Sequence, residues 1–118
     1  MNINEFDRLY RERKTAAGVT GSSVIISTDR VDPGRIRVIT HLSVENKTST
    51  YMKCRISVWN GAVDFAIDEA IYPAAGELLV HPKDILLGEG DILRATLTGT
   101  VTGDQIELHA IGWEMQRT

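Results

Sequence analysis

Two runs of alternating apolar residues near the C-terminus constrain this chain more than any other feature. The runs cover residues 92–98 and 105–114, and a polar segment bounded by Gly99 and Gly103 separates them. Alternation with a period of two is typical of strands that bury one face. We therefore predict an antiparallel hairpin whose inward face carries Leu93, Ala95, Leu97, Ile106, Leu108, Ala110 and Gly112.

Short apolar runs recur upstream, and turn signals such as Pro33-Gly34 and Asn60-Gly61 separate them. Strands are predicted at 24–26, 35–44, 51–59, 63–67, 77–80 and 85–87. Within 35–44 the alternation places Arg37, Ile39 and His41 on the outward face. The pattern predicts an all-β fold, an antiparallel β-sandwich of jelly-roll type.

The N-terminal segment carries a different spacing. Its apolar residues, Ile3, Phe6, Leu9 and Tyr10, lie on one stripe of a helix over Ile3–Lys14, and Asn2 can cap its start. Residues 15–23 are small and polar, as in a flexible joint. We therefore predict a short N-terminal α-helix, with residues 1–20 as a helical arm and linker and residues 21–118 as the β-sandwich domain.

Composition bounds the class of protein. The 118 residues carry a net charge of −3, with 42% hydrophobic and 25% charged residues, as in an ordinary soluble domain. The charge balance argues against a nucleic-acid partner. No apolar run approaches the roughly 20 residues of a membrane helix. The single cysteine, Cys54, lies on an apolar strand face and is predicted to be buried.

The sequence contains no recognisable catalytic or metal-binding motif. His41, His81 and His109 stand far apart, without the His-x-His pair that a metal site on a strand would use. The carboxylates Asp64, Asp68 and Glu69 near a turn could serve acid–base chemistry or bind calcium, but they are interpreted as part of a solvated face. We predict that the protein is not an enzyme and binds no metal or cofactor.

Several apolar residues fall on outward strand faces or on the helical stripe. A contiguous set of such residues marks an interface with another chain. The predicted interface residues are Phe6, Leu9, Tyr10, Ile39, Trp59, Ile111 and Trp113.

Three segments carry a resemblance to a known class of protein. They are residues 34–48, a strand followed by an Asn-Lys-Thr turn, then 86–95, and then the closing segment 103–114. Their order resembles small β-sandwich virion proteins of tailed bacteriophages, over residues 24–115. The resemblance implies a non-enzymatic part of the head, neck or tail, present in several copies. It implies self-association and contacts with other virion proteins, within a virion assembled in the host cytoplasm.

Two other functions are weighed against this one. A carbohydrate-binding β-sandwich module could stack sugars on Tyr51, Trp59, Tyr72 and Trp113, although these aromatic residues are few. A metal-dependent jelly-roll enzyme is disfavoured by the spacing of the histidines. The bacteriophage structural protein is the preferred hypothesis.

Overall fold

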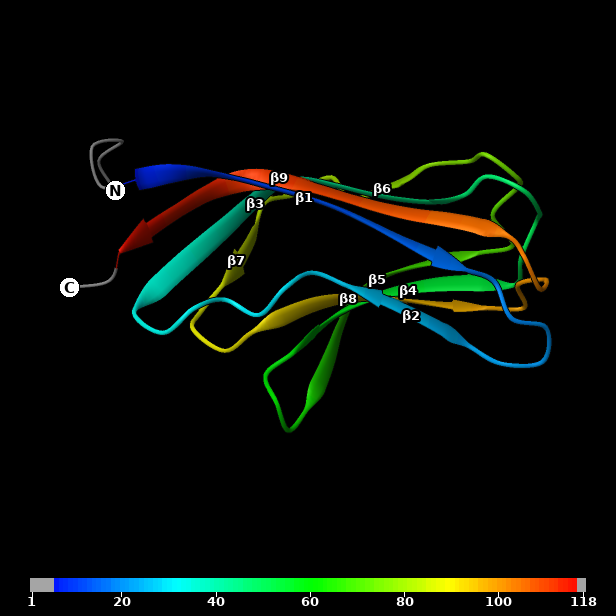
Figure 1. Ribbon diagram of the computed structural model, residues 1–118, viewed down its shortest axis with the longest axis horizontal. Helices are drawn as coiled ribbons and strands as arrows, with labels where there is room; N and C mark the ends of the chain where they lie inside the picture. Colours follow the sequence, from blue (N-terminus) through cyan, green and yellow to red (C-terminus); the bar gives the residue numbers. More distant parts are fainter. Residues whose placement is uncertain (1–5, 117–118) are drawn as a thin grey trace.

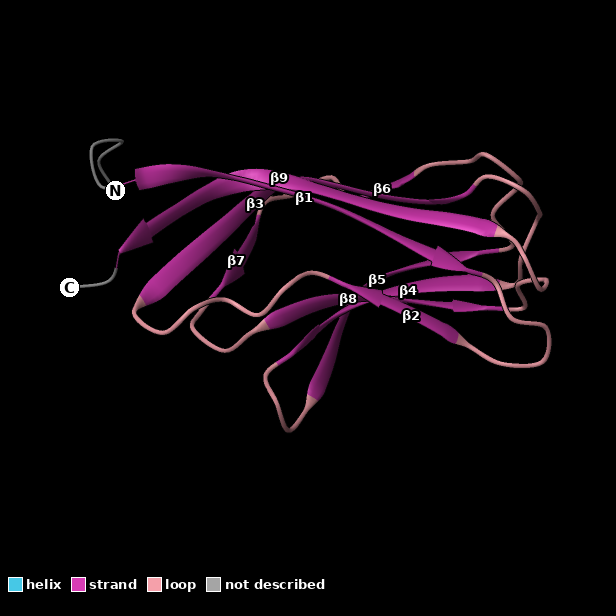
Figure 2. Cartoon of the chain, in the orientation of Figure 1, coloured by secondary structure: helices cyan, strands magenta, loops and turns pink. Residues whose placement is uncertain are grey.

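The computed structural model describes residues 6–116, with side chains described from Arg8 onward, and these residues form two antiparallel sheets (Figures 1 and 2). The five-stranded sheet has the order β1-β9-β3-β6, with β7 also paired to β3, and the four-stranded sheet has the order β2-β8-β4-β5. Successive strands mostly alternate between the sheets, as in a jelly roll. The strands are β1 (Phe6–Ala17), β2 (Val24–Ser27), β3 (Arg35–Asn46), β4 (Lys53–Trp59), β5 (Asp64–Ile71), β6 (Leu79–Val80), β7 (Ile85–Leu87), β8 (Ile92–Thr98) and β9 (Gln105–Gln116).

The predicted β-sandwich is therefore confirmed, but the predicted N-terminal helix is wrong. Residues Phe6–Ala17 form the edge strand β1, which pairs with β9 from Phe6↔Met115 to Ala17↔Gln105. A helix of about 12 residues is marginal without tertiary contacts. Pairing along the whole of β9 stabilises the extended form instead. Ile3, the first residue of the predicted stripe, lies outside the described residues.

Within the described residues, the structure has no helix long and apolar enough to cross a membrane.

The inward faces predicted for the two C-terminal runs are confirmed, whereas their pairing as a hairpin is wrong. Leu93, Ala95, Leu97, Ile106, Leu108 and Ala110 are all at most 1% exposed. Strand β8 pairs with β2 and β4, however, and β9 pairs with β1 and β3. The two runs thus lie in different sheets. This arrangement lets their apolar faces meet across the core, which buries both faces at once.

A β-bulge at Thr40 changes which residues of β3 face the core. Ile39 pairs with Gly112 and His41 pairs with Ile111, so Thr40 is an extra residue on β3. A Cβ atom at Gly112 would collide with the carbonyl oxygen of Val38, so the close approach of the two strands here requires glycine. The bulge reverses the alternation, and Ile39 faces inward, contrary to the prediction.

The buried cysteine is confirmed. Cys54 is 0% exposed and has no disulfide partner. Burial raises the pKa of its thiol to about 11. Cys54 therefore packs as a small apolar residue in its protonated form.

Candidate functional site

Three of the predicted interface residues share the outer face of the five-stranded sheet. Leu9 is 58% and Trp113 is 41% exposed, and Ile111 is half-buried. Leu9 pairs directly with Trp113 across β1 and β9, so their side chains are neighbours. The side chains of Leu108 and Ala110 are buried in the core. This confirms the predicted alternation of β9, in which Ile111 and Trp113 face outward.

The other predicted residues lie elsewhere. Trp59 is half-buried on the outer face of the four-stranded sheet, where the Arg94 guanidinium stacks 4.2 Å from the centre of its ring. Tyr10 and Ile39 lie in the core, at 6% and 1% exposure, because β1 is a strand and because β3 carries the bulge. This burial corrects their assignment to a surface. The side chain of Phe6 lies outside the described part.

Strand pairing extends the Leu9–Trp113 contact into an apolar row across the five-stranded sheet. Trp113 pairs with Val38 on β3, and Val38 pairs with Leu86 on β7. Leu86 is the most exposed of the four, at 68%. We call Leu9, Trp113, Val38 and Leu86 the apolar row. Sequence reasoning missed Val38, because uninterrupted alternation places it inward and the bulge at Thr40 turns it outward. It missed Leu86, because only the pairing of β7 with β3 brings Leu86 to this face.

Cationic side chains flank the apolar row on β1. Arg11 pairs with Ile111 and Arg13 pairs with His109, and both arginines are exposed. Neither arginine forms an ion pair with a described residue. Next to them, the rings of His41 and His109 meet edge to face, with their centroids 5.9 Å apart. We call Arg11 and Arg13 the cationic flank.

The environment of His109 disfavours its charged form. Burial is the main reason that its pKa lies below the ordinary value of 6.5, and the positive charges of Arg13 and Arg11 and the neighbouring His41 add to the effect. The buried Nε2 atom of His109 has no hydrogen-bond partner among the described residues. His109 is therefore neutral at pH 7.

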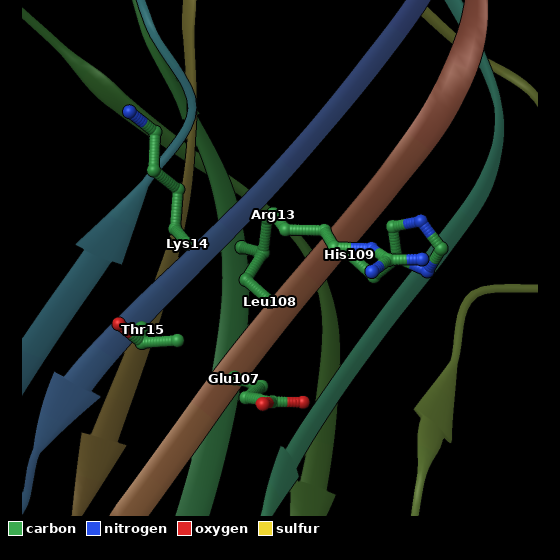
Figure 3. A pocket seen from close by; sticks show the side chains of 6 residues that line it. All are labelled: Arg13, Lys14, Thr15, Glu107, Leu108 and His109. Atoms are coloured by element: carbon green, nitrogen blue, oxygen red, sulfur yellow. The ribbon is translucent and has the colours of Figure 1, made fainter.

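Two shallow grooves lie beside His109. One, of about 300 Å³, is lined by Arg13, Lys14, Thr15, Glu107, Leu108 and His109, and Figure 3 shows Arg13 and His109 beside one another there. The other, of about 260 Å³, lies on the β3 side and is lined by His41, Ser43, Glu45, Leu78, Glu107 and His109. Glu107 is held by Lys47 at 3.0 Å. Among residues 6–116, no three histidine, cysteine or acidic side chains gather as a metal site would require.

A second candidate surface is the tip of the β4–β5 hairpin, which projects below the sandwich in Figure 1. The Asn60 side-chain oxygen accepts hydrogen bonds from the backbone N–H groups of Ala62 and Val63, both at 2.9 Å, and Gly61 has a φ of 100°. These features fix a tight turn. We call residues 60–67 the hairpin tip.

The hairpin tip exposes apolar side chains to solvent. Val63 is 49%, Phe65 is 54% and Ile67 is 40% exposed. Asp64, between Val63 and Phe65, is also exposed and forms no ion pair with any residue that the structure describes. The sequence marked residues 63–67 as a strand but gave no sign of this exposure, because it depends on how far the hairpin extends beyond the opposite sheet.

The free edge of β5 is protected against pairing with another strand. Ile56 pairs with Asp68 and Ser57 pairs with Ala66, which leaves Ile67 as a bulge. A hydrogen bond also joins Asp68 Oδ2 to His81 Nδ1, at 2.9 Å. Bulges and charged residues on an edge strand discourage sheet extension. The apolar side chains of the tip, and not its backbone, are therefore available for contact.

Charged residues inside the sandwich join β1 to β3 and β9. Glu114 is 2% exposed and accepts hydrogen bonds from Arg37 Nε, at 2.8 Å, and from Arg8. Arg37, 5% exposed, also stacks 4.1 Å above the ring of Tyr10. The Tyr10 hydroxyl donates a hydrogen bond to Glu12 at 2.6 Å. Burial is the main cause that raises the pKa of this hydroxyl, and the bond to Glu12 raises it further. We call Arg8, Tyr10, Glu12, Arg37 and Glu114 the ionic cluster.

The ionic cluster corrects the prediction that Arg37 faces outward. Its position in the core follows from the bulge at Thr40, as for Ile39. Glu114 has the same inward alternation as Ala110 and Gly112, and a carboxylate at such a position requires a cationic partner. That signal was present in the sequence, but the partner could not be identified from it.

No known protein family and no curated protein matches this sequence. Among solved structures, a protein described under "Bacillus endospore appendages form a novel family of disulfide-linked pili" is 12% identical, with a TM-score of 0.47, over 93% of this chain and 89% of that chain. A structure of infectious bursal disease virus, Gx strain, is 14% identical, with a TM-score of 0.46, over 92% of this chain and 32% of that chain. The corresponding structure of the Gt strain is 14% identical, with a TM-score of 0.41, over 92% and 33%.

This chain thus spans about a third of the length of the two viral chains. Identities and TM-scores as low as these do not indicate a function for this chain.

Proposed function

We propose that this chain is a non-enzymatic structural protein that assembles with copies of itself through exposed apolar surfaces. The observation that carries the proposal is the exposure of large apolar side chains at two places, the apolar row and the hairpin tip. Leu86, Leu9 and Phe65 are 68%, 58% and 54% exposed. Isolated exposed apolar residues are ordinary, but contiguous groups are typical of surfaces that another chain covers.

Within this class, the proposed role is that of a virion component of a tailed bacteriophage, in the head decoration, the neck or the tail. The sequence resemblance over residues 24–115 supports this role. The proposed partners are other virion proteins and further copies of the chain, and the proposed location is the virion. The sandwich would contribute rigid surfaces, and assembly would result from burying them.

The arrangement of aromatic residues does not favour the alternative carbohydrate-binding module. Trp59 lies on the outer face of the four-stranded sheet, whereas Trp113 lies on the outer face of the five-stranded sheet. Tyr51 is in the core, at 2% exposure, and Arg94 occupies one face of Trp59. These rings cannot form one platform for a sugar.

Sedimentation velocity over a wide range of protein concentrations tests the proposed self-assembly. We expect a folded protein whose average mass increases with concentration, since a buried apolar interface follows mass action. A protein that stays monomeric at every concentration would contradict the proposal. In that case, specific binding on a glycan array would favour the carbohydrate-binding alternative.

A further inference from the structure

The two exposed apolar surfaces point in opposite directions. In Figure 1 the five-stranded sheet forms the upper layer of the sandwich, and the hairpin tip projects below the four-stranded sheet. We propose, building on the self-assembly above, that the hairpin tip of one copy docks on the apolar row and cationic flank of a second copy. The interface is then head-to-tail, because two different surfaces meet.

Apolar side chains are available on both partners. The tip offers Val63, Phe65 and Ile67, which are 49%, 54% and 40% exposed. The apolar row offers Leu9, Trp113 and Leu86 on the other copy, which are 58%, 41% and 68% exposed. An aromatic side chain that enters a flat apolar row removes surface from water on both chains, and such anchors dominate most protein interfaces.

Charge favours a contact between the tip and the receiving face over a contact between two tips. The hairpin tip, residues 60–67, carries one acidic residue, Asp64, and no lysine or arginine. Two further acidic residues, Asp68 and Glu69, follow it on β5, opposite Ile56 and Arg55 of β4. Two tips facing each other would therefore bring like charges together. The receiving face carries Arg11 and Arg13, which form no ion pair with the described residues of their own chain. An acidic tip and a cationic flank are complementary, and this complementarity favours one orientation.

Asp64 is the charged residue of the hairpin tip. It is exposed and lies between Val63 and Phe65 but on the opposite face of the strand, because Asp64 pairs with Trp59 and Phe65 pairs with Val58. Both faces are exposed at the end of the hairpin, so a tip that docks end-on presents Asp64 and Phe65 together. Guanidinium groups bind carboxylates in a fixed geometry, and Arg11 and Arg13 lie two residues apart on one face of β1. Asp64 is therefore assigned to the arginines, and Phe65 to the apolar row.

A head-to-tail contact has a consequence that a symmetric contact lacks. After one contact, one copy keeps an unused receiving face and the other keeps an unused tip, so assembly continues until a ring closes or a filament grows. A variant with a substituted tip still has a working receiving face, and a variant with a substituted receiving face still has a working tip. The two variants together can then form a single contact and no more.

The test uses two double variants and one control. The tip variant is Val63→Ser with Phe65→Ser, and the face variant is Arg11→Glu with Arg13→Glu. All four positions are exposed in the single chain, so both variants should fold. The control is Ile25→Ser, because Ile25 is 55% exposed on the outer face of the four-stranded sheet, away from both surfaces. Circular dichroism and thermal unfolding verify the fold of each protein.

By sedimentation velocity, we expect each double variant to associate at least about thirtyfold more weakly than the wild type, as for the loss of a central interface residue. The control should assemble as the wild type does. Mixing the tip variant with the face variant in equal amounts should give a 1:1 dimer that grows no further. Higher salt should weaken wild-type assembly, since charges take part in the contact.

The outcomes separate this inference from the proposed function. If the wild type is monomeric at every concentration, self-assembly itself is overturned. If the wild type assembles but either double variant assembles normally, the head-to-tail inference is wrong and self-assembly stands. The same conclusion follows if both variants dissociate and their mixture stays monomeric. If a variant does not fold, the single substitutions Phe65→Ser and Arg11→Glu replace it, with the same expectations.

Discussion

Strands β1 and β2 lie at one side of the sandwich, and β5 lies at the other with the short strands β6 and β7. On the β1 side, charged groups are buried: Arg37 is 5% and Glu114 is 2% exposed. Lys14 of β1 also reaches Asp29, which follows β2, at 2.8 Å. On the β5 side, apolar groups are exposed, including Phe65 at 54% and Ile71 at 61%.

Both sides depart from the usual rule that apolar residues lie inside and polar residues outside. The β1 side buries charged groups, and the β5 side exposes apolar groups. On the β1 side the buried charges are paired, so the cost of removing them from water is offset by ion pairs and hydrogen bonds within one chain. On the β5 side nothing within the described chain offsets the exposure of apolar surface. The buried charges of the first side are paired within a single copy, whereas the exposed apolar side chains of the second side are left for another chain to cover. The following four changes test this difference, from the largest expected effect to the smallest.

Deleting residues 1–20 should abolish the native fold. The deletion removes all of β1 and exposes the edge of β9. It also leaves Arg37 without Tyr10 and Glu12, and Glu114 without Arg8. We expect a loss of cooperative thermal unfolding and of dispersed amide signals in the NMR spectrum. A truncated chain that folds normally would show instead that residues 1–20 act as a separable arm, as the sequence suggested.

Replacing Glu114 with alanine should destabilise the fold by about 3 kcal/mol, because it removes the carboxylate that accepts from Arg37 Nε at 2.8 Å and leaves the buried guanidinium only the more distant carboxylate of Glu12, at 3.7 Å. Urea unfolding followed by circular dichroism measures the loss. The matched control is the double variant Arg37→Met with Glu114→Leu, which removes both charges. It should recover part of the stability, because no unpaired charge stays in the core. Equal losses in the two proteins would mean that packing, and not charge pairing, governs this site.

Replacing His109 with glutamine should reduce the dependence of stability on pH. The pKa of His109 is lowered in the folded protein, so below about pH 6.5 the unfolded chain binds more protons than the folded chain. Wild-type stability should therefore fall as the pH decreases below that value. Above pH 7 His109 is neutral in both states, so its ionisation contributes nothing there.

The measurement is the free energy of unfolding between pH 4 and pH 8 for both proteins. The glutamine variant should show a shallower decrease on the acidic side. His41→Gln serves as the comparison, because His41 is the other half of the imidazole pair. An unchanged slope in His109→Gln would show that its burial does not control protonation.

The tip substitutions Val63→Ser and Phe65→Ser should change the stability of the monomer least. Both side chains are about half exposed, and surface substitutions usually alter the free energy of unfolding by no more than about 0.5 kcal/mol each. Thermal unfolding at low protein concentration, where assembly is absent, measures this effect. A large loss of stability would place the tip in the core of the single chain and remove the contrast with the β1 side.

The sequence by itself determined the class of the fold and much of the core. Alternation assigned the inward faces of β8 and β9 correctly, including Leu93, Leu97 and Leu108, and placed Cys54 inside. It also sent Trp113 outward, together with Ile111. These predictions succeeded because strands with one buried face repeat every two residues, and that repeat is a local property of the chain.

The tertiary structure alone decided three features. The bulge at Thr40 reversed the faces of Arg37 and Ile39, and it depends on the close approach of β3 to Gly112, which is 72 positions from Thr40. The pairing of residues 6–17 with β9 overrode a helical spacing that was too short to be stable alone. The apolar row required β7 to lie beside β3. Each of these depends on contacts between residues distant in the sequence, and periodicity within one segment contains no information about such contacts.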